Sequence, residues 1–370
     1  MVEERAPFDA YIGTRPVAEA HRFDVAALGR YLREHVAGFE GPLEVEQFKG
    51  GQSNPTYRLQ AGGKRYVMRR KPPGTLLPSA HAVDREYRVI TALAGTEVPV
   101  ARTHALCADE SVIGTMFYVM DCIEGRVLWD PLLPGMTSAG RGAIFDEMNR
   151  VIAALHRVDY RAIGLENFAM SARSSTTGKP GNYFARQIDR WSRQYRASET
   201  EKIDAMDRLI EWLPRNIPAG DATSIVHGDY RLDNMIFHAT EPRVLAVLDW
   251  ELSTLGHPMA DFSYHMMAWR LSSTEFRGLR GTDLAGLGIP SESDYRDRYL
   301  ERTGLAAPGE RDWTFCMAYN MFRAAAIFQG VMARALAGNA ASEQAVETGR
   351  RARPMAELGW RQIESTTFER

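Results

Sequence analysis

Cysteine is scarce in this chain of 370 residues, which contains only Cys107, Cys122 and Cys316. They lie far apart and form no CxxC pair, so the sequence predicts neither a disulfide framework nor a zinc site, and it favours a reducing compartment. No charge of one sign dominates, because the formal net charge is only −2. A near-neutral chain gives no indication of a nucleic-acid partner.

Long apolar runs are also missing. No window reaches the roughly 18 uninterrupted apolar residues that a membrane helix needs. The first residues, MVEERAPFDAYIG, are charged and lack the apolar centre of a signal peptide. We therefore expect a cytoplasmic protein without a membrane partner. The sequence does not indicate an oligomeric state.

The period of the apolar residues changes along the chain. A helical spacing over about 24–39, with Asp24 as its N-cap, is followed by strand-like alternation. We expect strands within 43–51, 55–71, 102–107 and 112–121, and one helix at 82–94. The first domain, 1–123, is therefore predicted to be an antiparallel sheet with one inserted helix.

The rest of the chain, 124–370, has a helical texture and forms the second predicted domain. The fold class is thus α+β and bilobal, with a sheet lobe followed by a larger helical lobe. The expected helices are 140–158, 183–197, 200–213, 257–271, 292–302 and 311–336, and the expected strands are 235–237 and 244–250.

A polar cluster interrupts the apolar stretch VHGDYRLDNMIF (226–237). It has the pattern H-G-D-x-x-x-x-N, and fifteen residues after the asparagine a strand ends in Asp249-Trp250-Glu251. This spacing matches a kinase catalytic loop followed by its metal-binding aspartate. Asp229 would accept the proton of a hydroxyl, while the oxygens of Asn234 and Asp249 would hold Mg²⁺. Arg231 would steady the transferred phosphoryl group.

The sequence resembles the aminoglycoside/choline phosphotransferase family, which has a protein-kinase-like fold. The stretches LHRVDYRAIGLENF, GNYFARQIDRWSRQY, VHGDYRLDNMIF and VLDWELSTLGHPMADFSYH carry the resemblance, which covers about 25–350. They resemble the branch whose domain is fused, in animals, to an acyl-CoA dehydrogenase. The resemblance implies that Asp229 is the base, that Asn234 and Asp249 are magnesium ligands, and that Asp261 braces the loop. We interpret His227 as structural support under the loop.

The first lobe is expected to hold ATP. FKGGQSNPTYRL (48–59) lies where kinases have a glycine-rich loop, and it offers backbone N–H groups and two polar side chains to phosphates. The G-x-G-x-x-G pattern is absent, so a plain hairpin turn would look the same. The candidates here are Gly50, Gly51, Ser53 and Asn54.

A cation and an acid should follow this turn. Strand alternation in RYVMRRK (65–71) places Arg69 and Lys71 on one face. Arg69 aligns best with the kinase lysine, and Lys71 is the alternative. The acidic partner of this cation is expected to be Glu86, with Asp84 as second choice.

The link between the lobes, MFYVMDCIEGRVL (116–128), resembles the kinase hinge. Backbone groups around Asp121 and Ile123 would meet the adenine edge, with Met120 beside it. A simple connection from strand to helix is compatible with the same residues.

The phosphate acceptor is less defined. The helical half has no dense acidic run for a polycation, and Arg186 and Arg190 lie on one face of the expected helix 183–197. This basic face, beside an apolar stripe, suits an anionic acceptor such as a hydroxyacyl-CoA, as the branch resemblance also implies. A solvated helix face over a core stripe is the alternative interpretation. Glu251 is a further candidate contact of the acceptor. An aminoglycoside, a sugar or an amino alcohol is the alternative. A silent nucleotide-binding pseudokinase is the alternative of another class. The sequence does not separate ATP from GTP.

Overall fold

The computed structural model describes residues 12–49, 54–72, 82–169, 183–220, 222–338 and 345–368. The chain forms two compact units. The sheet unit comprises Met1–Trp129, Ile163–Leu165 and Asp233–Ser253, and the helical unit comprises Asp130–Ala162, Glu166–Leu232 and Thr254–Arg370. The chain therefore re-enters the sheet unit immediately after Leu232, within the H-G-D-x-x-x-x-N motif.

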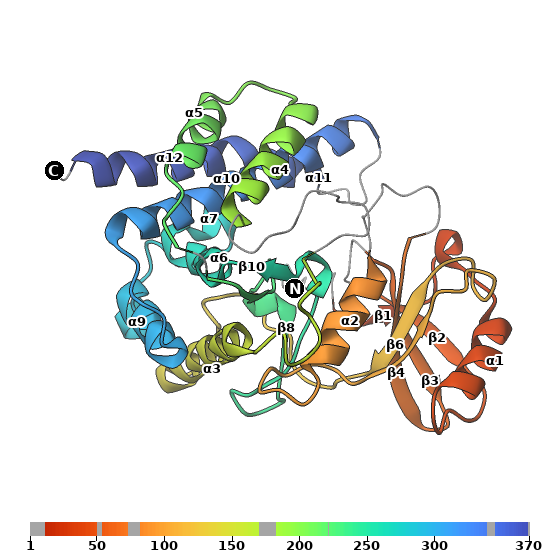
Figure 1. Ribbon diagram of the computed structural model, residues 1–370. Helices are drawn as coiled ribbons and strands as arrows, with labels where there is room; N and C mark the ends of the chain where they lie inside the picture. The colour runs from red at the N-terminus through yellow and green to blue at the C-terminus, as the bar shows by residue number, and fades with distance from the viewer. Residues whose placement is uncertain are drawn as a thin grey trace, which may run out of the picture. The chain divides into compact units, whose positions relative to one another are not determined.

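A six-stranded antiparallel sheet forms the centre of the sheet unit, with strand order β1-β2-β3-β4-β6-β5 (Figure 1). Its helices are α1 (Val25–His35) and α2 (Val83–Leu93), the latter inserted between β4 and β5. The strands are β1 (Thr14–Arg15), β2 (Glu44–Phe48), β3 (Thr56–Ala61), β4 (Lys64–Arg70), β5 (Thr103–Cys107) and β6 (Phe117–Asp121). The expected sheet with one inserted helix is confirmed.

Local signals explain these boundaries. The Asp24 side chain accepts a hydrogen bond from the Ala27 N–H at 2.9 Å, which caps α1. Gly62 and Gly63 have φ of 55° and 74°, the left-handed region that a tight hairpin between β3 and β4 requires. Leu28 and Leu32 of α1 join the apolar cluster of the sheet and are fully buried.

A hairpin made of β8 (Met235–Phe237) and β9 (Val244–Val247) also belongs to the sheet unit. Arg126 and Phe237 exchange backbone hydrogen bonds at 2.7 and 2.8 Å. A Cβ on the preceding Gly125 would lie 2.2 Å from the Phe237 oxygen, so only glycine fits where the chain leaves the sheet.

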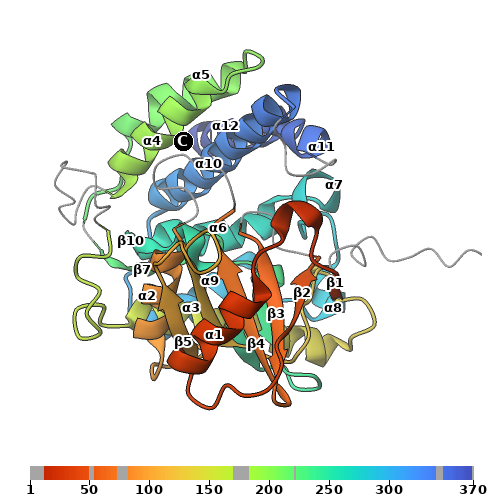
Figure 2. The ribbon, with the colours of Figure 1, turned by 90° about the vertical axis from the view of Figure 1, so that its right-hand side faces the viewer.

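The helical unit is built around α10 (Glu310–Leu336), which is buried along most of its length. Helices α4 (Tyr183–Ala197) and α12 (Ala352–Phe368) pack against α10, and α5 (Asp204–Trp212) packs against α12 (Figure 2). The other elements are α3 (Ser138–Arg157), α6 (Pro258–Arg270), α7 (Ser273–Phe276), α8 (Leu284–Leu287), α9 (Glu292–Thr303), α11 (Ala345–Gly349), β7 (Ser224–Val226) and β10 (Thr254–Gly256).

Every long helix expected in this half is present, but α12 is missing from the sequence prediction. Pro354 lies in the first turn of α12, where a helix has no intrahelical partner for the missing N–H. The bilobal, protein-kinase-like α+β class is confirmed. Of the helices described, none is both long and apolar enough to cross a bilayer.

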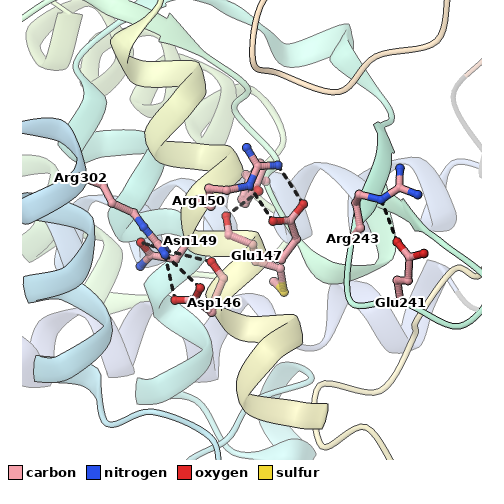
Figure 3. Close-up of polar contacts among 9 residues, drawn as sticks. Asp146, Glu147, Asn149, Arg150, Glu241, Arg243 and Arg302 are labelled. Atoms are coloured by element: carbon pink, nitrogen blue, oxygen red, sulfur yellow. Dashed lines mark hydrogen bonds and ion pairs between the residues drawn. The ribbon is translucent and has the colours of Figure 1, made fainter. Parts of the chain in front are cut away.

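An ion-pair network fastens α9 to α3 (Figure 3). Arg302 donates to both carboxylate oxygens of Asp146 at 3.0 Å and to the Asn149 side-chain oxygen at 3.0 Å. Arg298 adds a bond to Asp146 at 2.5 Å. Partial burial raises the pKa of Asp146, but the bonds and charges of Arg302 and Arg298 outweigh it and hold the pKa below its usual value.

We predict that Asp146→Asn lowers the free energy of unfolding by about 0.5–1 kcal/mol at pH 7, because the pair is partly screened by solvent. A carboxylate whose pKa is lowered by folding stabilises above its unfolded pKa, near 4, and loses this effect as the pH falls through its folded pKa. Urea unfolding at pH 7 and pH 3.5 measures the difference, which should shrink at the lower pH. An equal difference at both values would contradict the network.

Candidate active site

The H-G-D loop follows β7 and is held by a buried carboxylate from α6. The Asp261 side chain accepts the backbone N–H of His227 at 2.7 Å and that of Gly228 at 2.8 Å, and it lies 3.2 Å from His156 Nε2. Burial raises the pKa of Asp261, but the hydrogen bond and charge of His156 and the His227 N–H outweigh it and lower the pKa. Asp261 therefore stays ionised and fixes the loop.

Asp229 follows directly in this loop. Its N–H donates to His227 Nδ1 at 3.1 Å, so the buried His227 supports the loop from beneath. Its carboxylate accepts the Tyr264 hydroxyl at 2.5 Å and lies 3.2 Å from Arg231 Nε. The side chain keeps 22% of its surface exposed, which leaves it accessible to a small molecule.

The loop backbone has one more partner, from α10. Arg323 donates to the Gly228 carbonyl at 2.5 Å, and its guanidinium carbon lies 5.0 Å from the centre of the Tyr264 ring. Tyr264 and Arg323 are absent from the sequence prediction. Tyr264 lies one helical turn after Asp261, and Arg323 is a lone cation in the apolar run FCMAYNMFRAAAIF. A charged residue inside an apolar helix was the available signal, because such residues are seldom buried without a role.

A second polar cluster lies within the sheet unit around Arg69. Arg69 Nε lies 3.3 Å from Glu86 Oε2, and Arg69 Nη2 lies 3.1 Å from Asp249 Oδ1. The fully buried Glu86 also accepts bonds from the Tyr118 hydroxyl at 3.0 Å and the Asn54 amide at 2.9 Å. Burial lowers the pKa of Arg69, but the two carboxylates outweigh it and raise the pKa. The structure thus pairs Arg69 with Glu86.

The predicted metal ligands flank the same end of the β8–β9 hairpin. The Leu248 N–H donates to the Asn234 carbonyl at 2.8 Å, which places Asn234 and Asp249 on adjacent chain ends. Asp249 has φ 62° and ψ 61°, a left-handed conformation that aspartate tolerates better than most residues. Oxygens of Asp249, Glu251 and Glu86 all lie within 4.8 Å of one another. Three carboxylates beside one arginine suit a hard divalent cation.

The remaining candidates have mixed outcomes. Arg70 points to the opposite face of β4 from Arg69, against Phe23 and Tyr57. Lys71 is half-buried, as are Asp121 and Ile123, and Met120 is buried. The Asp121 N–H already donates to the Arg102 carbonyl at 2.8 Å. Gly50, Gly51 and Ser53 lie outside the described residues.

The acceptor candidates lie in different units. Arg186 and Arg190 belong to α4 of the helical unit, where Arg186 is half-buried and Arg190 is exposed. Glu251 belongs to the sheet unit and forms part of its carboxylate cluster. Asn54 contacts Glu251 at 3.5 Å as well as Glu86, so the structure places Asn54 at this cluster.

The two-unit fold, with a sheet unit and a helical unit, is that of the protein-kinase-like phosphotransferases. The chain belongs to the phosphotransferase enzyme family, whose model matches residues 44–304. It is 46% identical over 350 residues to mouse acyl-CoA dehydrogenase family member 10, covering 94% of this chain but 32% of that protein. The chain thus spans about a third of this relative.

Solved structures agree with this assignment of the fold. A Ralstonia eutropha protein assigned as an aminoglycoside phosphotransferase is 59% identical, with a TM-score of 0.83, covering 93% of this chain and 99% of that one. Spectinomycin phosphotransferase, in complex with ADP and spectinomycin, has a TM-score of 0.57 at 11% identity, covering 92% of this chain and 98% of that one. At this identity the likeness shows the fold alone.

We predict that Asp261→Asn lowers the free energy of unfolding by about 3 kcal/mol, because it weakens the acceptor for two buried N–H groups and removes the charge opposite His156. Urea unfolding measures the change. The exposed Asp297→Asn in α9 is the control, and it should stay within about 0.5 kcal/mol of the unsubstituted protein. Equal stability of the two variants would contradict the bracing role.

Proposed function

We propose that the protein transfers the γ-phosphoryl group of ATP to a hydroxyl of a small molecule, with Mg²⁺ as cofactor. The observation that carries the proposal is Asp229, an accessible carboxylate in a loop whose backbone is fixed by Asp261 and Arg323. A fixed carboxylate within reach of an acceptor hydroxyl is what a general base requires.

In this reaction Asp229 accepts the hydroxyl proton while the acceptor oxygen bonds to the γ-phosphorus and the bond to the β,γ-bridging oxygen breaks, which releases ADP. Arg231, beside Asp229, stabilises the charge on the transferred group. Asn234 and Asp249 would hold Mg²⁺, which would neutralise phosphate charge when bound. Arg69 contacts the phosphates, with Lys71 as the alternative, and Glu86 positions Arg69.

The adenine and the phosphate loop complete the ATP site. We propose that the main chain at Asp121 and Ile123 meets the adenine, with Met120 beside it. Because the Asp121 N–H already donates to the Arg102 carbonyl, we propose that the other main-chain groups of this segment form the hydrogen bonds to adenine. Gly50, Gly51, Ser53 and Asn54 are proposed to cover the phosphates. The ADP in the spectinomycin phosphotransferase complex supports nucleotide use in this fold.

For the acceptor we propose a hydroxyacyl-CoA, with Arg186, Arg190 and Glu251 as candidate contacts. Support comes from the relative named as an acyl-CoA dehydrogenase, of which this chain matches one part. The alternative acceptors are an aminoglycoside, a sugar or an amino alcohol, since an aminopropanol kinase shares the fold. A pseudokinase is less well supported, because Asp229, Asn234 and Asp249 are all present.

We predict that Asp229→Asn and Asp249→Ala each lower Mg²⁺-dependent phosphorylation of a hydroxyl acceptor by about 100-fold or more, since one removes the base and the other a metal ligand. ADP release across a panel of hydroxyl compounds measures this. Glu241→Gln is the matched control, because Glu241 is an exposed carboxylate paired with Arg243 in the β8–β9 hairpin (Figure 3). Turnover at the control's rate in either variant would overturn the assigned role.

We also predict that coenzyme A alone raises the melting temperature by several degrees, because a ligand that binds only the folded state stabilises it. A thermal-shift titration with coenzyme A, ATP–Mg²⁺ and a cationic aminoglycoside compares the three. Stabilisation by the aminoglycoside and not by coenzyme A would favour the alternative acceptor.

A further inference from the structure

Two arginines of the helical unit lie against one tryptophan close to the base. The guanidinium carbon of Arg190, on α4, lies 5.1 Å from the centre of the Trp191 ring, and that of Arg323, on α10, lies 5.7 Å from it. Arg323 also bonds to the Gly228 carbonyl and contacts Tyr264, the residue that donates to Asp229. A positive site therefore adjoins the loop that carries the base.

Neither arginine has a carboxylate partner. In the part of the chain that the structure describes, Arg190 makes no ion pair and no hydrogen bond, and Arg323 uses its donors only on a neutral carbonyl. Other arginines of α4 differ, since Arg193 pairs with Asp189 at 2.6 Å and Arg196 pairs with Asp207 at 2.5 Å. A guanidinium has five N–H donors, so the two side chains offer donors that no described residue accepts.

Electrostatics and accessibility agree with this geometry. Desolvation of its buried part lowers the pKa of the Arg190 guanidinium, and the positive charge of Arg323 lowers it further. Burial also lowers the pKa of Arg323, but three tyrosine hydroxyls and the Asp229 carboxylate outweigh it and raise the pKa. Two cations in one neighbourhood repel each other, and a bound anion relieves that repulsion. Arg190 is exposed, so a ligand can reach it, while Arg323 is only 6% exposed and is fixed by its neighbours. The Arg323 side chain is thus preorganised, whereas the exposed Arg190 side chain can adjust its conformation to a ligand.

We propose that Arg190 and Arg323 together bind an anionic group of the phosphate acceptor, a carboxylate or a phosphate. The inference rests on the proposed phosphotransfer, because it assigns the acceptor side of that reaction. In this proposal Arg190 and Arg323 determine the specificity for the phosphate acceptor, and polycationic acceptors such as aminoglycosides are excluded. Guanidinium groups suit this task because their planar donors match carboxylate and phosphate oxygens in pairs.

Matched acceptor pairs test the charge requirement. 3-Hydroxybutyrate and its methyl ester share a hydroxyl and differ in a carboxylate, while the 4′-phosphopantetheine and pantetheine thioesters of 3-hydroxybutyrate differ in one phosphate. We expect the anionic member of at least one pair to have a kcat/KM at least tenfold above its neutral partner. The pair that shows the preference identifies the anion. Equal kcat/KM within both pairs overturns the proposal.

Arg190→Gln is the deciding variant, since the side chain is exposed and its loss should leave the fold intact. We expect it to raise KM for the anionic acceptor about tenfold, the range for a charged hydrogen bond, and to leave KM for ATP within twofold. Arg193→Gln, one turn along α4 and already paired with Asp189, is the control and should match the unsubstituted protein. An unchanged KM in Arg190→Gln overturns the proposal.

A binding measurement separates this inference from the proposed reaction. Isothermal titration with inorganic sulfate, in the presence of ADP–Mg²⁺, needs no turnover. We expect binding to the unsubstituted protein and to Arg193→Gln, and at least tenfold weaker binding to Arg190→Gln. If no hydroxyl compound is phosphorylated but this difference appears, the anion site stands and the proposed reaction falls. Equal sulfate binding in all three proteins overturns the anion site and leaves the reaction unaffected.

Discussion

The buried carboxylate of Asp261 is the constraint on which the helical unit depends. A charge removed from water is tolerated only when hydrogen bonds and an opposite charge compensate it. Here two consecutive backbone N–H groups and the His156 ring do so, and His156 in turn bonds to the Tyr299 hydroxyl at 2.6 Å. The same carboxylate therefore connects the H-G-D loop with α6, α3 and α9. The loop backbone is held in one conformation because two of its N–H groups donate to this buried carboxylate.

The sheet unit also contains a buried carboxylate, and a different set of partners compensates its charge. Glu86 is fully buried, and its oxygens receive Arg69, the Tyr118 hydroxyl and the Asn54 amide. Arg69 also forms an ion pair with Asp249. The left-handed backbone conformation of Asp249 costs free energy, and it persists only where surrounding interactions compensate that cost. Each unit thus contains its own fixed set of charged groups, attached to regular elements rather than to long loops. Such attachment holds side-chain positions to the precision that transfer chemistry requires.

Much of this organisation could be predicted from the sequence, because short-range signals determine it. Strand alternation separated Arg69 from Arg70, and the Asp24 cap and the Gly62-Gly63 turn set element boundaries. The spacing from Asp229 to Asn234 and Asp249 indicated a kinase-like loop and metal motif. The prediction missed α12, whose burial comes from its packing against α10 and α5. It missed Tyr264 and Arg323 because their roles come from helix packing, which brings together residues 35 and 95 positions from the loop. A sequence motif is enough to assign the family. Hydrogen-bond partners that lie far from the loop in the sequence can be identified only from a three-dimensional structure.

The long helix α10 connects the H-G-D loop with the helices packed on its other side. Its Asn320 bonds to the Ala260 carbonyl and the Ser263 hydroxyl of α6, and Arg323 bonds to the Gly228 carbonyl, so one side of α10 belongs to the catalytic framework. Helix α4 packs on α10 but makes none of these bonds. A substitution at an exposed position of α4 can therefore change the surface of the helical unit without touching the bonds that hold the H-G-D loop.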